Sequence, residues 1–225
     1  MLAQRYGNDK ERVEIGIDEA GRGPMFGPVY AAAVVLPVDS PSFPYELMKD
    51  SKRFHSKKKI QEVAARIKTE SVAWSVASRD HAYIDQRNIR VATHSAMHSA
   101  IHDVLSKARP ETSPLLLVDG SDFTPMPWSR PGGGDAAGFA RHVCIPKGDN
   151  INASIAAASI LAKVERDAHI AELCRADPLL DLRYGLSKNQ GYGTAQHLAG
   201  LRKYGLSRFH RRTFGLCAEL ARQID

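Results

Sequence analysis

The sequence predicts an α/β protein in which a mixed sheet is flanked by helices, with a small helical extension at the C-terminal end. Three observations support this prediction. Short apolar runs with strand periodicity end at acidic residues and glycine turns, longer segments with helical periodicity lie between them, and further helical signals close the chain. The 225 residues, 43% hydrophobic and 25% charged, suit one large globular domain with an appendage.

Three strands are predicted in the first third of the chain. Residues 13–17 alternate apolar side chains with others and end at an acidic pair followed by glycines, as a half-buried strand does. The segment VYAAAVVLP at 29–37 follows after too few residues for a helical crossover, so we expect it to pair antiparallel with the first strand. A helix at 57–69 precedes the third strand, SVAWSVASR at 71–79. These strands should form an antiparallel meander.

The middle of the chain predicts a long helix, a buried strand and a loop. Helical spacing from about residue 83 to residue 108 ends before a proline. The run LLLV at 115–118 is apolar throughout, as a strand buried on both faces is. Residues 121–140 contain three prolines and GGGD, which predicts a flexible loop that we interpret as a tolerated insertion. A short strand, HVCI at 142–145, follows it.

The last third of the chain is predicted to be helical. The alanine-rich segment 153–174 has small residues that permit close packing on a sheet, and an Asp-Pro pair closes it. Helical signals resume at 194–203 and again near the C-terminal end. We therefore divide the chain into a main domain at residues 1–193 and a C-terminal helical extension at residues 194–225.

Composition and charge limit the functional classes. The formal net charge of +6 favours a polyanionic partner only modestly, since many basic proteins bind none. Cys144, Cys174 and Cys217 form no paired motif for zinc or redox chemistry, which predicts a reducing, cytoplasmic setting. The N-terminal residues lack an apolar signal core, and no apolar stretch approaches the length of a membrane span. We expect neither secretion nor membrane insertion.

Four carboxylates, Asp18, Glu19, Asp119 and Asp149, each lie at or just beyond the end of a predicted strand, where open α/β sheets gather ligands. Carboxylates are hard oxygen ligands that suit Mg²⁺ or Mn²⁺, and two such cations about 3.5 to 4 Å apart can activate water and stabilise a leaving oxygen. The sequence therefore predicts a two-metal hydrolytic site. Asp18 and Glu19 can share it only if the chain turns between them, because successive strand residues point to opposite faces.

Each carboxylate also has a structural interpretation. Asp119-Gly120 is an ordinary turn signal, and Asp149 or Asn152 could cap the following helix. Asp167 is a rival metal ligand, although its mid-helix position favours an ion pair on or near the surface. The joint placement of the four acids, rather than any single one, favours the metal site.

Two basic clusters and a tyrosine favour a nucleic-acid substrate. Residues 49–59 hold six Lys or Arg, and residues 202–212 hold five, with aromatic and histidine side chains between them. Either could be a solvated surface, but beside clustered acids they predict phosphate contacts that flank a metal site. Tyr192 lies between glycines that leave its ring exposed, where it could stack on a sugar or a base.

Two other patterns are interpreted as structural. His94, His98 and His102 share a helical face, but no carboxylate or cysteine completes a metal site there. The glycines of DEAGRGPMFGP and of GGGD lack the Gly-Lys-Ser/Thr of a nucleotide-binding P-loop.

A series of motifs extends over nearly the whole chain, from about Val13 to Phe214. They are GIDEAGRGPMFGPVYAAAVVL, Asp50-Ser51-Lys52, YIDQRNI, LLLVDG, PKGDNINASIAAASILAKVERD, NQGYGTAQHL and FHRRTFG. In this order the motifs closely resemble those of the ribonuclease HII family. The first motif alone is nearly diagnostic, whereas VDG or KGD alone would mean little.

The resemblance implies a ribonuclease H-like fold, with the catalytic domain at residues 1–193 and a C-terminal extension that contributes to substrate binding. It implies that Asp18, Glu19, Asp119 and Asp149 form an acidic tetrad that binds Mn²⁺ or Mg²⁺. The implied enzyme is an endonuclease, acting as a monomer on RNA/DNA hybrids and on DNA duplexes that contain ribonucleotides.

The resemblance also implies how the substrate is read. Gly21-Arg22-Gly23 and Tyr192 would detect the ribose 2′-hydroxyl, the main chemical handle that separates RNA from DNA, and the RNA-to-DNA junction. Cleavage would fall on the 5′ side of a ribonucleotide and leave a 3′-hydroxyl and a 5′-phosphate. Further substrate contacts or supporting residues would be Lys52, Ser154, Lys163, Arg166, His210, Arg211 and Arg212.

Two other functional classes stay open on the sequence. Another nuclease of the same fold, of the resolvase or integrase type, would also cluster acids but is expected to lack the Gly-Arg-Gly segment and the tyrosine. A nucleic-acid-binding module without catalysis would not nick a duplex containing one ribonucleotide when divalent metal is added. Gln190 stands where the family usually has Lys, and Asn150-Ile151-Asn152 replaces small or basic residues, but no departure removes a carboxylate.

Overall fold

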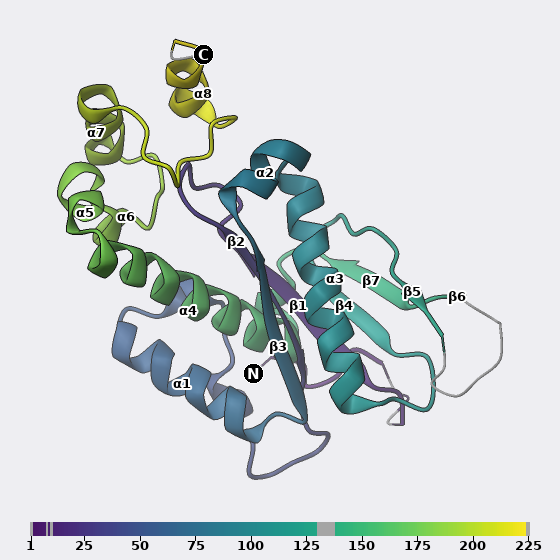
Figure 1. The fold of residues 1–225 in the computed structure, drawn as a ribbon. Coiled ribbons are helices and arrows are strands. Elements are labelled where there is room, and N and C mark those ends of the chain that lie inside the picture. The colour runs from purple at the N-terminus through teal and green to yellow at the C-terminus, as the bar shows by residue number, and fades with distance from the viewer. Residues whose placement is uncertain (1, 8, 10, 130–137, 224–225) are drawn as a thin grey trace.

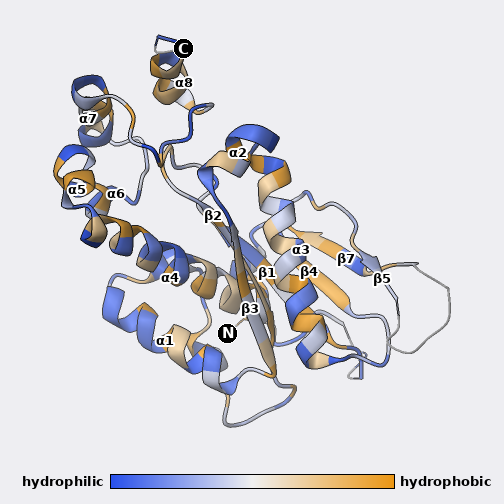
Figure 2. Cartoon of the chain, in the orientation of Figure 1, coloured by the Kyte–Doolittle hydropathy of each residue, from blue (hydrophilic) through white to orange (hydrophobic). Residues whose placement is uncertain are grey.

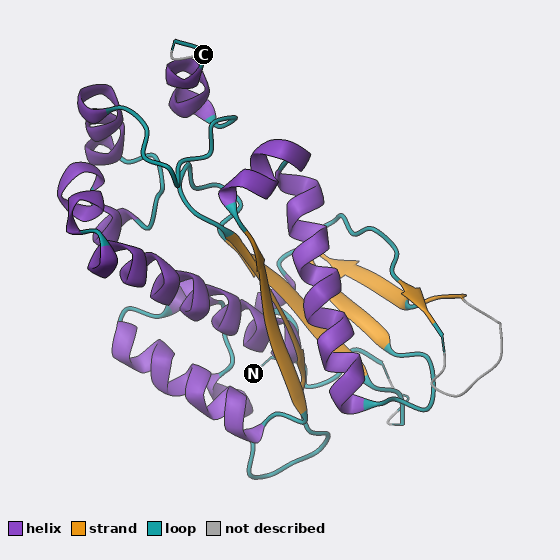
Figure 3. Cartoon of the chain, in the orientation of Figure 1, coloured by secondary structure: helices purple, strands orange, loops and turns teal. Residues whose placement is uncertain are grey.

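The computed structural model describes residues 2–7, 9, 11–129 and 138–223. Within these residues five strands form one mixed sheet in the spatial order β3-β2-β1-β4-β7, with helices on both faces (Figures 1 and 3). This confirms the predicted fold class. The strands are β1 (Glu14–Ala20), β2 (Val29–Val35), β3 (Ala73–Arg79), β4 (Leu115–Asp119) and β7 (Arg141–Ile145).

The order and direction of the strands bring the acidic strand ends together. β1, β2 and β3 form the predicted antiparallel meander, and β4 and β7 extend the sheet in parallel with β1. Ile17 pairs with Val118, and Asp119 pairs with Ile145, so β1 and β4 end at the same edge of the sheet. That edge is the carboxyl end of parallel strands, where ligands collect in open α/β sheets.

Helices cover both faces of this sheet. α1 (Lys57–Glu70) and α4 (Ala153–Ala176) lie on one face, and α3 (Ile89–Ala108) lies on the other (Figure 1). The three helices correspond to segments with predicted helical periodicity. β1, β2 and β4 are therefore buried from both sides, which explains why β2 and β4 are apolar along most of their length (Figure 2).

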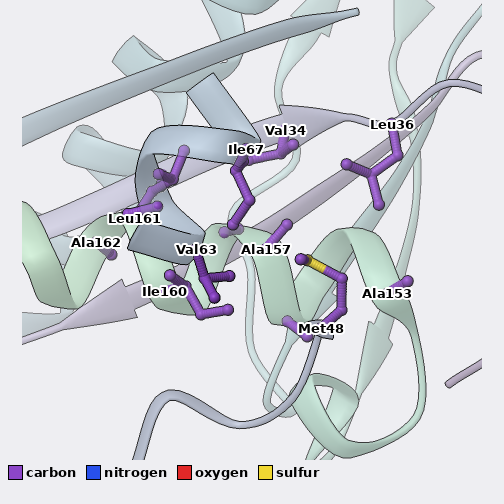
Figure 4. Close-up of a cluster of buried hydrophobic side chains, with 14 of the residues drawn as sticks. Val34, Leu36, Met48, Val63, Ile67, Ala153, Ala157, Ile160, Leu161 and Ala162 are labelled. Atoms are coloured by element: carbon purple, nitrogen blue, oxygen red, sulfur yellow. The ribbon is translucent and has the colours of Figure 1, made fainter. Parts of the chain in front are cut away.

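Each face of the sheet has its own core layer because successive strand residues alternate in direction. Val34 of β2 lies in the layer beneath α1 and α4, which Figure 4 shows together with Ile67 and Leu161. The next residue, Val35, lies in the opposite layer with Met97 of α3. The sequence alternation thus directs one strand into two separate clusters.

Helix α4 approaches β1 very closely at Gly16. A Cβ at this position would lie 2.1 Å from the carbonyl carbon of Ser154 and 2.4 Å from the backbone nitrogen of Ile155. Real side chains do not occupy such distances, so glycine permits a contact of backbone on backbone. Ala156, Ala157, Ala158 and Ala162 in the first part of α4 are buried, as expected for small residues packed on a sheet.

The predicted long helix from residue 83 to residue 108 is divided in two. α2 (His81–Arg87) ends and α3 begins at Asn88, which has a φ of 71°. The Asn88 side chain accepts a hydrogen bond from the backbone N–H of Val91 and so caps α3. Asparagine tolerates left-handed backbone and caps helices well, and the spacing of apolar residues reports neither property.

The predicted loop at 121–140 contains a short hairpin. β5 (Pro127–Trp128) pairs antiparallel with β6 (Gly138–Phe139). Residues 130–137 lie outside the described residues. The interpretation of this loop as an insertion stays a prediction.

The C-terminal part of the described chain adds short helices beyond the edge of the sheet (Figure 1). α7 and α8 confirm predicted helices, whereas the short helices α5 and α6 were not predicted. These helices are α5 (Pro178–Tyr184), α6 (Leu186–Asn189), α7 (Ala195–Tyr204) and α8 (Gly215–Ala221). None of the helices in the described part of the chain has the length and apolarity that crossing a membrane requires.

An apolar cluster joins these helices to the rest of the molecule. It contains Phe26 from the segment after β1, Ile170 of α4, Tyr184 of α5 and Leu201 of α7. The predicted domain boundary between residues 193 and 194 runs through this cluster. The division into two domains therefore stays a prediction.

We expect Gly16→Ala to destabilise the protein by about 3 kcal/mol or more, because the added methyl group meets backbone that cannot rotate away. Chemical denaturation would measure the change. Gly138→Ala is the matched control, since a Cβ there meets no atom within 4 Å. Equal stability of the two variants would contradict the close contact between α4 and β1.

Candidate active site

The ends of β1 and β4 open into a cavity of about 230 Å³ that contains all four predicted carboxylates. Most of the predicted substrate contacts line the same cavity. Its lining comprises the predicted residues Asp18, Glu19, Gly21, Arg22, Gly23, Lys52, Asp119, Asp149, Lys163, Arg166 and Tyr192, and in addition Ala20, Ser51, Ser159 and Asp167.

Asp18 and Glu19 reach the cavity without the turn that was expected between them. β1 continues through both residues and ends at Ala20. Asp18 is paired with Ala32, on the α4 face of the sheet, and Glu19 with Ala31, on the opposite face. The cavity lies beyond the end of the strand, so side chains from both faces can line it.

Asp119 and Asp149 come from two segments on the β4 side of β1. Asp119 is the last residue of β4, and its Oδ1 accepts a hydrogen bond from the Gly148 N–H at 2.6 Å. Asp149 lies in the 3₁₀ helix η3 (Gly148–Asn150), directly before α4. The cap of α4 is Asn152, whose side chain accepts hydrogen bonds from two backbone N–H groups, so Asp149 is not required for capping.

Burial and repulsion between neighbouring acids disfavour the charged forms of Asp18, Glu19 and Asp149. Burial, followed by the charges of Glu19 and Asp119, raises the pKa of Asp18 well above its ordinary value. Burial also raises the pKa of Glu19, although Arg22 at 3.5 Å opposes this effect. Burial and then the charge of Asp50 raise the pKa of Asp149. Because these acids repel one another, the binding of a cation in the cavity is favourable.

The residues around the carboxylates orient them. The Ser159 side chain hydrogen-bonds to Asp18, and its hydroxyl lies 3.1 Å from that of Ser51, so α4 and the 3₁₀ helix η2 (Ser51–Arg53) meet at this carboxylate. The rival ligand Asp167 accepts a hydrogen bond from Lys163 Nζ at 2.8 Å, which agrees with the ion pair expected within one helix. Sequence reasoning missed Ser51 and Ser159 as site residues, because single serines carry no spacing signal.

The Gly-Arg-Gly segment and Tyr192 form one wall of the cavity. Gly21 has a φ of 94°, and a Cβ there would lie 2.1 Å from Arg166 Nε. A Cβ on Gly23 would lie 3.5 Å from the Tyr192 ring, so the ring lies against this glycine. Tyr192 is 49% exposed, which confirms the predicted exposure of its ring.

Two buried arginines hold this wall from behind. Arg166 donates to the carbonyl oxygens of Phe26, Pro28 and Gln190 at 3.0 to 3.2 Å. Arg211, which is fully buried, donates to the carbonyl oxygens of Gly21, Arg22 and Gly27 at 2.7 to 3.0 Å. Burial lowers the pKa of Arg211 to about 9.

These positions correct several of the expected substrate contacts. Arg211 and His210 are buried, so neither side chain can reach a phosphate from where it lies. Ser154 is also buried and donates to Asn152, beneath β1 and outside the cavity. The physical reason is that a run of basic residues predicts solvent exposure, whereas backbone carbonyls can bind a guanidinium inside the protein. Arg212 is exposed, as expected of a phosphate contact.

The histidines of α3 take no part in this cavity. They line a larger, open cavity of about 790 Å³ along α3. His94 Nδ1 lies 2.8 Å from the Thr124 hydroxyl and His98 Nε2 lies 2.8 Å from the Thr124 carbonyl oxygen, which supports their interpretation as structural residues. The described cysteines are free thiols.

The comparisons with known proteins identify the family of the chain. The family model described as Ribonuclease HII matches residues 15–217. The ribonuclease HII of Parabacteroides distasonis is 41% identical over 208 residues, 92% of each chain. That of Porphyromonas gingivalis is 40% identical over 214 residues, 95% of this chain and 94% of the relative.

Solved structures show the same fold at lower identity. The ribonuclease H2 of Pyrococcus horikoshii matches with a TM-score of 0.71 and 20% identity, covering 93% of this chain and 97% of the other. A Bst ribonuclease HIII in complex with Mn²⁺ matches with a TM-score of 0.68 and 21% identity, covering 95% and 70%. The match of the family model over most of the chain, together with relatives at about 40% identity, shows that this chain belongs to the ribonuclease HII family of endoribonucleases, hydrolases that act on RNA/DNA hybrids.

Proposed function

We propose that this cavity cleaves the strand of a duplex on the 5′ side of a ribonucleotide. Hydrolysis joins an oxygen from water to the phosphorus and releases the 3′-oxygen of the preceding nucleotide, which leaves a 3′-hydroxyl and a 5′-phosphate. The observation that carries this proposal is that four carboxylates, two buried and two half-buried, share one cavity with the Gly-Arg-Gly segment and Tyr192. The acids supply a site for the chemistry, and the glycine segment and the tyrosine supply a surface for the ribose.

The donor set of the cavity fits two divalent cations. Asp18, Glu19, Asp119 and Asp149 supply carboxylate oxygens, the ligands that Mg²⁺ and Mn²⁺ prefer. Among the described residues no three acidic, His or Cys side chains already form the closed ligand set of a metal. When bound, such cations lower the pKa of water and stabilise the charge of a leaving oxygen. The related ribonuclease HIII was solved with Mn²⁺.

The remaining residues of the cavity bind and orient the substrate. Lys52 and Arg22 are cationic and line the same cavity as the acids, where they can contact the phosphates on either side of the cleaved bond. Lys163, which lines it too, holds Asp167 and is a further candidate for such a contact. Arg166 holds the backbone of the cavity wall rather than the substrate.

The ribose is recognised at the wall formed by Gly23 and Tyr192. The exposed ring lies against the glycine, and the absence of a side chain on Gly23 lets a sugar approach the backbone. Backbone groups of this segment can hydrogen-bond to a 2′-hydroxyl, which only RNA carries. The proposed substrates are RNA/DNA hybrids and DNA duplexes that contain ribonucleotides, bound by a monomer of this chain.

The first prediction from the proposed function concerns the charge of the four carboxylates in the metal-free protein. Because burial raises the pKa of Asp18, the folded protein binds a proton there more tightly than the unfolded chain does, and stability falls as pH rises above the ordinary carboxyl pKa. Asp18→Asn should therefore raise the melting temperature of the metal-free protein at pH 7. Each kcal/mol gained in the free energy of unfolding corresponds to about 2 to 4 °C in melting temperature. Mn²⁺ should raise the melting temperature of the wild type more than that of the variant.

Asp122→Asn is the control for this measurement. Asp122 is exposed, and its hydrogen bond with Arg90 lowers its pKa, so its neutralisation should not stabilise the protein. A metal-free Asp18→Asn protein that melts below the wild type would contradict the repulsive site.

The second prediction tests the metal role of Asp119. Asp119→Asn retains the oxygen that accepts the Gly148 N–H and so preserves the local fold, but it removes a ligand charge. We expect cleavage to fall about 10³-fold, the effect of losing roughly 4 kcal/mol of transition-state stabilisation, with hybrid binding largely retained. Asp167→Asn, at the ion-paired rival position, should lose far less activity. Wild-type turnover by Asp119→Asn would refute the assignment.

The third prediction concerns Tyr192 as the ribose sensor. Stacking on an aromatic ring contributes about 1 to 3 kcal/mol, so Tyr192→Ala should reduce cleavage at a single embedded ribonucleotide by roughly five-fold to two-hundred-fold. Cleavage within a long hybrid tract should fall less. Parallel rates on the two substrates, measured with the melting temperature, test this expectation. Equal losses on both substrates with a lowered melting temperature would assign Tyr192 a structural role.

A further inference from the structure

A pair of buried histidines links the C-terminal segment to Tyr192. His197 lies in α7 and His210 in the segment between α7 and α8, and both are almost fully buried. Their Nε2 atoms lie 3.0 Å apart. His197 Nδ1 lies 2.9 Å from the Tyr192 carbonyl oxygen, and His210 Nδ1 lies 2.9 Å from the Ser207 backbone nitrogen.

The partners determine where each proton lies. A carbonyl oxygen only accepts, so His197 Nδ1 carries a proton and donates it to Tyr192. The Ser207 N–H only donates, so His210 Nδ1 is the acceptor and its Nε2 carries the proton. His210 Nε2–H therefore donates to the bare Nε2 of His197. A second proton on either ring would place two N–H groups face to face.

The surroundings keep both rings neutral. Burial lowers the pKa of His197, and burial followed by the neighbouring His197 lowers the pKa of His210 to about 3. The His210 ring packs against the rings of Tyr184 and Phe26, with centroids 4.7 and 5.1 Å away. Among the described residues, no carboxylate forms a hydrogen bond or an ion pair with either ring. A positive charge on either histidine would therefore have no compensating partner.

The segment between α7 and α8, which contains His210, also holds the Gly-Arg-Gly side of the cavity wall. The Arg211 backbone N–H donates to the Met25 carbonyl oxygen, and the Gly27 N–H donates to that of Phe209. The Arg211 guanidinium holds the carbonyls of Gly21 and Arg22. Consecutive residues of one segment thus hold the Gly-Arg-Gly segment through Arg211 and the Tyr192 backbone through His210 and His197.

We propose that His197 and His210 are positioning residues that set the specificity for a ribonucleotide by fixing the Tyr192 backbone at its distance from Gly23. The proposal rests on the proposed role of Tyr192 as ribose sensor. The Tyr192 ring is exposed on one side, so its placement depends on backbone contacts behind it. A misplacement on the order of 1 Å at such a site is enough to reduce a rate by about 10²-fold.

A matched pair of substitutions tests the proposal. In His197→Asn the side-chain amide nitrogen takes the place of Nδ1 and can donate to Tyr192, whereas His197→Leu has nearly the same shape and no donor. The measurement is the ratio of kcat/KM on a duplex with one ribonucleotide to kcat/KM on a long hybrid, with melting temperatures in parallel. We expect His197→Leu to lower the ratio several-fold, up to the loss shown by Tyr192→Ala, and His197→Asn to retain most of it.

Tyr192→Ala, measured alongside, separates the possible failures. If Tyr192→Ala lowers the ratio and His197→Leu does not, the positioning proposal is overturned and the ribose sensor stands. If Tyr192→Ala leaves the ratio unchanged, the sensor role is wrong and the positioning role falls with it. A merely structural histidine would lower both rates in proportion to the folded fraction and leave the ratio unchanged.

A spectroscopic measurement on the unmodified protein does not depend on the folding of any variant. Ring ¹⁵N chemical shifts at pH 5.5 should identify two neutral histidines, His197 protonated at Nδ1 and His210 protonated at Nε2. A charged ring, or a His197 protonated at Nε2, would overturn the hydrogen-bond chain and with it the proposal.

Discussion

The contact between α4 and β1 at Gly16 is the constraint on which the geometry of the site depends. It brings backbone against backbone, so no side chain can absorb a shift between helix and strand. Asp149 precedes this contact in the 3₁₀ helix η3, Ser159 and Lys163 follow it along α4, and each of them lines the cavity beside Asp18. The absence of a side chain at Gly16 thus fixes the cavity wall formed by α4 relative to Asp18 and Glu19.

The charges around the cavity are distributed so that the acids stay available for metal ions. Two buried arginines, Arg166 and Arg211, lie near the cavity. Their guanidinium groups donate hydrogen bonds to backbone carbonyl oxygens rather than to a carboxylate. Burial raises the pKa of Asp18 instead of an ion pair lowering it. The rigid sheet, buried on both faces, tolerates this repulsion because its core supplies the stability. Such a cluster favours positively charged ligands, as the proposed two-metal site requires.

Sequence patterns predicted the parts of the molecule that depend on periodicity and strand ends. The alternation in β1, the apolar run of β4 and the glycines after Glu19 were enough to predict the sheet edge and its acids. The roles of His197, His210 and Arg211 could not be predicted, because their partners are backbone carbonyls and N–H groups far away in the chain. Arg211 and Gly21 are separated by 190 residues, and a basic cluster carries the same signal whether it lies in solvent or in the interior.

The motif YIDQRNI contains a residue that holds the segment between α7 and α8 in place. Asp85 of α2 accepts hydrogen bonds from the backbone N–H groups of Arg212 and Thr213 and from the Thr213 hydroxyl. It holds the segment from outside, while Arg211 and His210 face inward to the two sides of the ribose wall. The predicted C-terminal extension therefore holds the cavity wall from behind, although none of its described residues lines the cavity. We therefore expect changes in α2 to act through this segment on the proposed ribose wall rather than on the proposed metal site.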